Sequence, residues 1–254
     1  MPWQSATVPE AVSPYDRIAR LYDPWSASVT EDVPFYLEEA RRVAPGPVVE
    51  LGVGTGRIAV PIAADGIRVI GVDSSRCMLE VCRERGALAG AASNIDLRLG
   101  DLRKPPVIGP VPLVLCPFRS FLHLRTDAER IDALQATYGL LAPGGRLVFD
   151  VFEPGPDDIS ETHGRWLERE PCIWERAVWD VGARTLTLSV RGETGEATMR
   201  LSWISPAEWH ALLEQLGFVV EACYGWFDRR PYSGGEDTVW IARRPEEHPV
   251  KLPA

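Results

Sequence analysis

Long basic runs, closely spaced cysteine pairs and long apolar runs are all missing from this sequence. Its 254 residues carry a formal net charge of −9, and the arginines occur at most in adjacent pairs. A nucleic-acid substrate would favour a positive surface, so this charge balance argues against one. No apolar run approaches the ~20 residues that a membrane-spanning helix needs. The N-terminus also lacks a charged-then-apolar leader. The sequence therefore predicts neither a nucleic-acid nor a membrane partner.

The five cysteines are odd in number and form no Cys-x-x-Cys pair. Structural disulfides belong to oxidising compartments, so the simplest interpretation is a reducing, cytoplasmic location. No cluster of His, Cys, Asp and Glu has the spacing of metal ligands, and no metal site is predicted. The length suits one α/β domain with an insertion, or one domain and a small lobe.

One stretch, GPVVELGVGTGRIAVPIAADGIRVIGVD at residues 46–73, organises the rest of the chain. It predicts a buried parallel strand, a glycine turn, a helix over residues 57–64 that Pro61 kinks or shortens, and a second strand ending on Asp73. Glycines let bare backbone approach a ligand closely. An acidic residue at the end of the second strand is placed to accept hydrogen bonds from ribose hydroxyls. The stretch therefore predicts a nucleoside site, and a tight turn with no ligand is the plain alternative.

The glycine spacing separates two kinds of nucleoside ligand. A dinucleotide fingerprint, Gly-x-Gly-x-x-Gly, needs its third glycine where this chain has Arg57. The glycines are instead Gly52, Gly54 and Gly56, and Glu50 precedes them. A carboxylate at that position would repel a pyrophosphate and suits a cationic ligand with a free amino group. The pattern therefore disfavours a nicotinamide dinucleotide.

The ELGVGTG run followed by VIGVD resembles the class I S-adenosylmethionine (SAM) dependent methyltransferases. The resemblance spans roughly residues 15–243 and is closest to the small-molecule type that methylates amines and amino sugars. It implies a Rossmann-like, doubly wound α/β sheet of seven strands, the last antiparallel. It also implies a single in-line displacement that moves the sulfonium methyl to a nitrogen or oxygen of a small molecule. A non-catalytic SAM-binding or regulatory protein and, less in keeping with the glycines, an NAD-dependent oxidoreductase stay open as alternatives.

The resemblance implies a set of cofactor-binding residues along the first four strands. Met78 would lie against the adenine, Asp101 would receive the adenine amino group, and a tyrosine of YDRIARLYD would reach the methionyl end. The alternative for Met78 is a place in the hydrophobic core. For Asp101 it is an ordinary loop aspartate, and for the YDRIARLYD segment it is an amphipathic helix that packs its aromatic residues. The cofactor-binding candidates are Tyr15, Tyr22, Glu50, Gly52, Gly54, Gly56, Arg57, Asp73, Ser74, Met78, Asp101, Leu102, Cys116 and Pro117.

The exit of the fourth predicted strand, CPFRSFLH, should line the reaction site, because ligands in open α/β sheets lie at the carboxyl ends of strands. Amide- and nucleobase-modifying members of the family carry Asp/Asn-Pro-Pro-aromatic here, and this chain has Cys-Pro-Phe-Arg instead. His123 is the first candidate for an acid-base or orienting role, and Arg119 is the second catalytic candidate. The alternative is a histidine that caps the next helix or only packs.

The chain divides into a predicted helical lid, a SAM-binding core in two pieces and an inserted sheet, at residues 13–45, 46–155 with 205–245, and 156–204. Alternating apolar and polar residues predict about three antiparallel strands in the insert. By resemblance this insert covers the substrate side or forms a homodimer contact. A small sheet that buries its own tryptophans is the alternative.

Capping residues predict where three helices begin. Ser13 is the predicted N-cap of a first helix, Thr126 with its capping-box partner Glu129 starts a second over residues 126–141, and Ser205 opens another. The first 12 residues are predicted to be loose, and the chain from residue 245 is predicted to be a polar tail.

Overall fold

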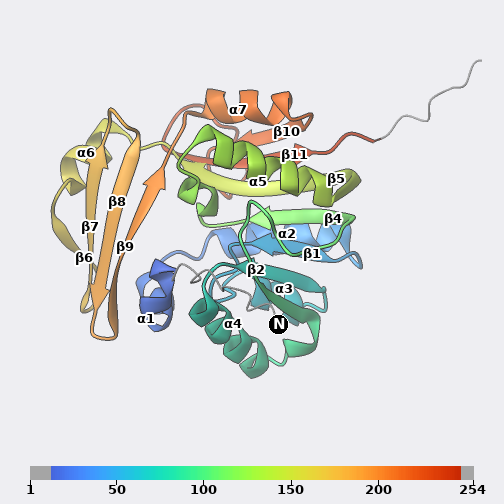
Figure 1. The fold of residues 1–254 in the computed structure, drawn as a ribbon, viewed down its shortest axis with the longest axis horizontal. Helices are drawn as coiled ribbons and strands as arrows, with labels where there is room; N and C mark the ends of the chain where they lie inside the picture. Colours follow the sequence, from blue (N-terminus) through green and yellow to red (C-terminus); the bar gives the residue numbers. More distant parts are fainter. Residues whose placement is uncertain (1–12, 247–254) are drawn as a thin grey trace, which may run out of the picture.

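The computed structural model describes residues 13–246 and contains two β-sheets (Figure 1). The loose start predicted for residues 1–12, and residues 247–254 of the predicted tail, lie outside the described residues. The larger sheet consists of β1 (Val48–Leu51), β2 (Val69–Asp73), β3 (Ile95–Leu99), β4 (Val111–Cys116), β5 (Leu141–Phe152), β10 (Val219–Tyr224) and β11 (Asp237–Arg243).

The large sheet has seven strands in the order β10-β11-β5-β4-β1-β2-β3. Strands β1 to β5 pair with one another in parallel. Strand β11, the last in the sequence, pairs antiparallel with both β5 and β10. This arrangement confirms the predicted doubly wound sheet with an antiparallel last strand. The strand order reverses between β1 and β4, so a ligand site is expected at the carboxyl ends of these two strands.

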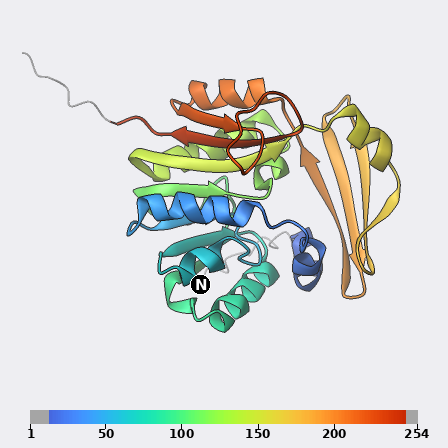
Figure 2. The same ribbon diagram turned by 180° about the vertical axis from the view of Figure 1, so that it is seen from behind.

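Helices cover both faces of the large sheet, which is why strands such as β1 are buried along their whole length. Buried residues of α5 and α7 pack on one face, and those of α2, α3 and α4 pack on the other (Figures 1 and 2). These helices are α2 (Asp32–Val43), α3 (Ala59–Ala64), α4 (Arg76–Leu88), α5 (Asp127–Leu140) and α7 (Pro206–Gln215).

Helix α3 is shorter than the predicted helix over residues 57–64. It begins at Ala59, which places Pro61 in its first turn. The first backbone N–H groups of a helix have no partner inside the helix, so a proline is tolerated there. Pro61 therefore sits in a shortened helix.

The second sheet consists of four antiparallel strands, β6 (Trp166–Glu170), β7 (Ile173–Asp180), β8 (Thr185–Gly192) and β9 (Gly195–Ser202). The prediction of about three strands was wrong by one, because the chain turns at Cys172 between β6 and β7. Cys172 has a φ of 63°, in the left-handed region that non-glycine residues seldom occupy. Helix α6 (Pro156–Thr162), which precedes this sheet, was not predicted.

The N-terminal segment bridges the two sheets. It forms a 3-10 turn, η1 (Pro14–Arg17), and then α1 (Ala19–Trp25), in place of one helix capped by Ser13. The Ser13 side chain makes no capping hydrogen bond. Ile18 and Leu21 pack against buried residues of the small sheet, while Asp16 accepts hydrogen bonds from the Ser75 hydroxyl and the Cys77 N–H at the start of α4.

The remaining predicted caps are mostly confirmed. The Thr126 hydroxyl accepts a hydrogen bond from the Glu129 N–H at the start of α5, and Ser205 forms a complete capping box with Glu208. Glu129 does not complete a box with Thr126, because its carboxylate accepts from the Arg125 N–H instead.

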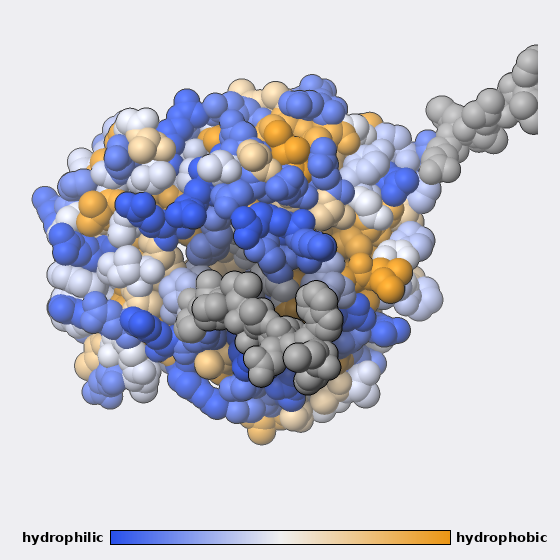
Figure 3. Space-filling model, viewed as in Figure 1, coloured by the Kyte–Doolittle hydropathy of each residue, from blue (hydrophilic) through white to orange (hydrophobic). Residues whose placement is uncertain are grey.

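Hydrophilic residues prevail over the face drawn in Figure 3, with hydrophobic ones scattered among them. Between residues 13 and 246, no helix has the length and apolar character to cross a bilayer. All five cysteines are free thiols.

Candidate active site

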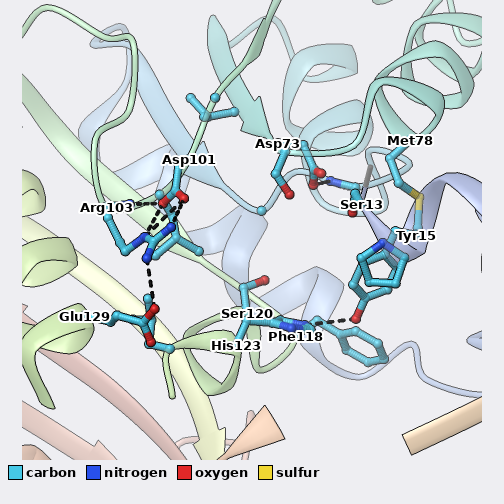
Figure 4. A pocket seen from close by; sticks show the side chains of 18 of the residues that line it. Ser13, Tyr15, Asp73, Met78, Asp101, Arg103, Phe118, Ser120, His123 and Glu129 are labelled. Carbon is cyan, nitrogen blue, oxygen red and sulfur yellow. Dashed lines mark hydrogen bonds and ion pairs between the residues drawn. The ribbon is translucent and has the colours of Figure 1, made fainter. Parts of the chain in front are cut away.

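A cavity of about 300 Å³ opens at the carboxyl ends of β1 to β4, where the strand order predicts a ligand site. The labelled side chains in Figure 4 surround its open centre. Predicted cofactor-binding or catalytic residues that line it are Tyr15, Tyr22, Gly52, Gly54, Asp73, Ser74, Met78, Asp101, Leu102 and His123. The fold therefore brings together residues from the N-terminal segment and from four separate loops.

The glycine loop after β1 needs its three glycines for two different reasons. All three have positive φ values, 72° at Gly52, 54° at Gly54 and 81° at Gly56. A Cβ at Gly52 would lie 2.5 Å from the Ser120 Oγ, and one at Gly56 would lie 2.5 Å from the Cys82 Sγ. At Gly54 the nearest atom would be 3.9 Å away. Gly52 and Gly56 therefore allow close packing within the protein, whereas Gly54 leaves free space in the wall of the cavity.

Asp73 ends β2 with its carboxylate held at the edge of the cavity. One oxygen accepts a hydrogen bond from the Gly54 N–H and the other accepts from the Ser75 N–H, both at 2.8 Å. Burial raises the pKa of this carboxyl group, and the two backbone hydrogen bonds oppose that rise. The Ser75 hydroxyl accepts a hydrogen bond from the Met78 N–H and caps the start of α4.

We expect Asp73→Ala to weaken SAM binding by roughly 1.5–3 kcal/mol, because it removes hydrogen-bond acceptors for a bound ribose and frees the Gly54 N–H. Calorimetry on the folded variant measures this loss. Asp96→Ala on β3 is the matched control, since Asp96 pairs with Arg98 and does not line the cavity. Unchanged SAM affinity in a folded Asp73 variant would remove this residue from the site.

The far wall of the cavity carries a chain of charges that sequence reasoning missed. The Arg103 side chain donates to the Asp101 carboxylate, and its Nη1 donates to Glu129 at 2.9 Å (Figure 4). Hydrogen bonding from the Arg103 side chain lowers the pKa of Asp101. Arg103 lies only two residues beyond Asp101, so its position was a usable signal, but nothing local in the sequence points to Glu129.

Tyr15 and His123 meet on the opposite side of the cavity. The Tyr15 hydroxyl lies 2.9 Å from His123 Nε2, with the two rings edge to face (Figure 4). Burial lowers the pKa of His123 to about 4 and raises that of Tyr15 well above its usual range. At neutral pH the imidazole is therefore uncharged and the phenol keeps its proton. The pair can offer either a lone pair or a hydrogen to a third group, depending on the imidazole tautomer.

Aromatic rings continue from this pair along the cavity wall. The Tyr22 ring centroid lies 5.9 Å from that of Tyr15 and 6.2 Å from that of Phe118. The Arg57 guanidinium stacks over the Phe118 ring at 4.4 Å. This side of the cavity is therefore largely apolar around the Tyr15–His123 pair.

Some predicted site residues lie near the cavity without lining it, namely Glu50, Gly56, Arg57, Cys116, Pro117 and Arg119. Arg57 pairs with the buried carboxylate of Asp32, and Arg119 pairs with Asp237 at 2.7 Å. Glu50 is only 2% exposed and its Oε2 has no hydrogen-bond partner, so burial raises its pKa well above the usual range. The roles assigned to these residues stay predictions.

The residues present fit SAM. Gly54 leaves space for a ligand, Asp73 presents a fixed carboxylate, and the unpartnered Glu50 oxygen lies one residue before the end of β1. In residues 13–246, no group of three or more His, Cys, Asp and Glu side chains could hold a metal ion.

Comparison with known proteins points the same way. Residues 48–145 match the methyltransferase domain family. The structure of the CcbJ methyltransferase from Streptomyces caelestis is 28% identical, with a TM-score of 0.79, covering 92% of this chain and 98% of that one. An uncharacterized methyltransferase of Geobacillus kaustophilus is 33% identical over 144 residues, which are 51% of this chain and 64% of that protein. The cypemycin N-terminal methyltransferase from Streptomyces sp is 23% identical over 88% of this chain and 91% of its own length.

Residues 48–145 carry a methyltransferase domain, and the fold and the glycine loop are similar to those of the class I SAM-dependent methyltransferases, whose cofactor is SAM. These findings give no support to a non-catalytic SAM-binding protein or to an NAD-dependent oxidoreductase.

Proposed function

We propose that this protein transfers the methyl group of SAM to an amine nitrogen of a small molecule. The observation that carries the proposal is the uncharged His123, which lines the cavity and is hydrogen bonded to Tyr15 (Figure 4). A hydroxyl acceptor needs a base to become nucleophilic, and an imidazole with a pKa of about 4 is a weak base. An uncharged amine already has a free lone pair and needs only to be held in place. The match to an N-terminal methyltransferase over 88% of this chain also favours nitrogen.

The chain's own residues would supply binding and orientation. SAM, when bound, supplies an electrophilic methyl group. Asp73 and the glycine loop would hold its ribose and methionyl parts, and Met78 would lie against its adenine. Tyr15 and His123 would accept hydrogen bonds from the acceptor N–H groups and turn its lone pair toward the cofactor. Holding two reactants in line can contribute about 7–11 kcal/mol to lowering a barrier, so orientation alone is a sufficient source of rate.

The domain organisation extends this proposal. Residues 13–45 would include the lid, residues 46–155 and 205–245 the SAM-binding core, and residues 156–204 the cover over the substrate side. The support is that η1 and α1 contact both α4 and the small sheet, next to the cavity that Tyr15 and Tyr22 line. A homodimer contact through the insert and a cytoplasmic location stay predictions.

Turnover tests the proposal directly. The protein is incubated with SAM and, separately, with panels of primary amines, amino sugars, N-terminal peptides and phenols. We expect S-adenosylhomocysteine to form with an amine panel. Titration with SAM and NAD beforehand establishes which cofactor binds. Turnover of phenols alone would reassign the acceptor atom to oxygen, and SAM binding without turnover of any panel would contradict the proposed reaction.

A further inference from the structure

The chain leaves β4 through two residues in an unfavourable backbone conformation. Phe118 and Arg119 have φ values of 54° and 63°. Non-glycine residues seldom adopt this left-handed region, and they persist there only when surrounding structure holds them. The next residues form the 3-10 turn η3 (Ser120–His123). The Phe118–Arg119 turn therefore sets the direction of the segment that carries His123.

The carboxylate of Asp150 on β5 accepts hydrogen bonds from both residues of this turn. One carboxylate oxygen accepts a hydrogen bond from the Phe118 N–H at 2.7 Å, and the other accepts from the Arg119 N–H at 3.1 Å. The Tyr36 hydroxyl, from α2, donates to the first oxygen at 2.5 Å. Successive N–H groups that converge on one anion form a stable concave nest, and here the anion is a side chain of the protein itself.

We propose that Asp150 is a positioning residue for methyl transfer, because its carboxylate fixes the left-handed turn and thereby places Phe118 and His123 in the cavity. The inference rests on the proposed function for its catalytic meaning. Asp150 is 6% exposed and does not line the cavity, so it acts on the reaction only through the turn.

Several titratable or charged groups surround the Asp150 carboxylate. The titratable and charged groups that face it are Tyr36 and Asp32 from α2, Cys116 on β4, Arg57 after β1, and Arg119 in the turn itself. Burial raises the pKa of Asp150 to about 6, against the opposing effect of the Tyr36 hydrogen bond. The group is therefore ionised at neutral pH and gains a proton as the pH falls through about 6.

Asparagine tests the carboxylate at nearly constant volume. An asparagine has one acceptor oxygen, so its NH₂ group would face one of the two backbone N–H donors, and one turn hydrogen bond would be lost. In Asp150→Asn we expect kcat to fall by about 10–100-fold with SAM affinity almost unchanged, since displacing a group by about 1 Å can cost 10²-fold in rate. We expect wild-type kcat to fall as the pH drops below about 6, and we expect this fall to be absent in the variant.

Tyr36→Phe is the matched control. It removes the third donor to the same carboxylate but leaves both turn hydrogen bonds, so kcat should stay close to the wild-type value at a pH well above about 6. Because the Tyr36 hydrogen bond lowers the pKa of Asp150, its loss should move the fall in kcat to higher pH. Hydrogen exchange at the Phe118 and Arg119 amides should be faster in Asp150→Asn and unchanged in Tyr36→Phe. Hydrogen exchange needs no methyl acceptor, so it measures the stability of the Phe118–Arg119 turn even if amine methylation is not found.

Two results would overturn the proposal. If Asp150→Asn melts earlier but keeps wild-type kcat per folded molecule and the wild-type pH profile, Asp150 has only a structural role. If the two amides exchange at the wild-type rate in Asp150→Asn, the carboxylate does not hold the turn. Failure of the amine assay with faster amide exchange would instead count against the proposed function and leave Asp150 as the anchor of the turn.

Discussion

Gly54→Val is expected to abolish detectable SAM binding, a loss of more than about 100-fold or about 2.7 kcal/mol. A Cβ at this position would meet no protein atom closer than 3.9 Å, so the added side chain extends into the space that the cavity offers a ligand. Gly54 also donates its N–H to Asp73, so a shift of the loop would disturb this carboxylate, which is proposed to bind the ribose, as well. Calorimetric titration with SAM measures the effect.

A valine at positive φ also strains the backbone, and Gly66→Val controls for that strain. Gly66 has a φ of 86°, is exposed and has nothing within 4 Å of an added Cβ, but it lies after α3 and away from the cavity. We expect Gly66→Val to lose thermal stability and still bind SAM. A folded Gly54→Val that binds SAM like wild type would show that the glycine loop does not contact the cofactor.

The geometry of the glycine loop and of Asp73 was predictable because its signals are local. The signals lie close together in the sequence. They are glycines that need positive φ, an acidic residue at a strand end and a serine cap. The order of the strands was predictable only by resemblance, since no spacing in the chain states that β4 lies beside β1. The N–H donors that fix Asp73 follow from that local pattern once the strand and the turn are placed.

The side of the cavity that carries Tyr15 and His123 depends on contacts between distant positions, which one sequence does not reveal. Tyr15 reaches His123 across 108 residues, and Tyr36 reaches Asp150 across 114. Asp150 looked like an ordinary residue of a strand, because the pattern gives no sign that two successive N–H groups will point at it. The extra strand of the insert was missed for a related reason, since the left-handed turn at Cys172 uses neither glycine nor asparagine.

His123→Asn is expected to lower kcat by roughly 100-fold while SAM affinity stays nearly unchanged, because the proposed function places His123 beside the acceptor and the cofactor contacts on other loops. A general base would instead contribute up to about 10⁴-fold. Because burial lowers the pKa of His123 to about 4, the imidazole stays uncharged until the pH falls towards 4. We therefore expect no inflection from His123 in the kcat profile between about pH 5 and 8. Tyr15→Phe should lower kcat in the same direction, since it removes the hydroxyl that lies against His123 Nε2.

The folding stability of His123→Asn distinguishes a histidine that orients the acceptor from one that only packs the cavity wall. The unfolded chain protonates this histidine near pH 6.5 and the folded chain only near 4, so the unfolded state binds more protons in between. Folding stability from this group is therefore present above about pH 6.5 and lost as the pH falls towards 4, and His123→Asn should remove that loss. His210→Asn on α7, an exposed histidine beside Glu214, is the control that should change neither kcat nor SAM affinity. If His123→Asn melts early but turns over at the wild-type rate per folded molecule, His123 packs the cavity wall and does not orient the acceptor.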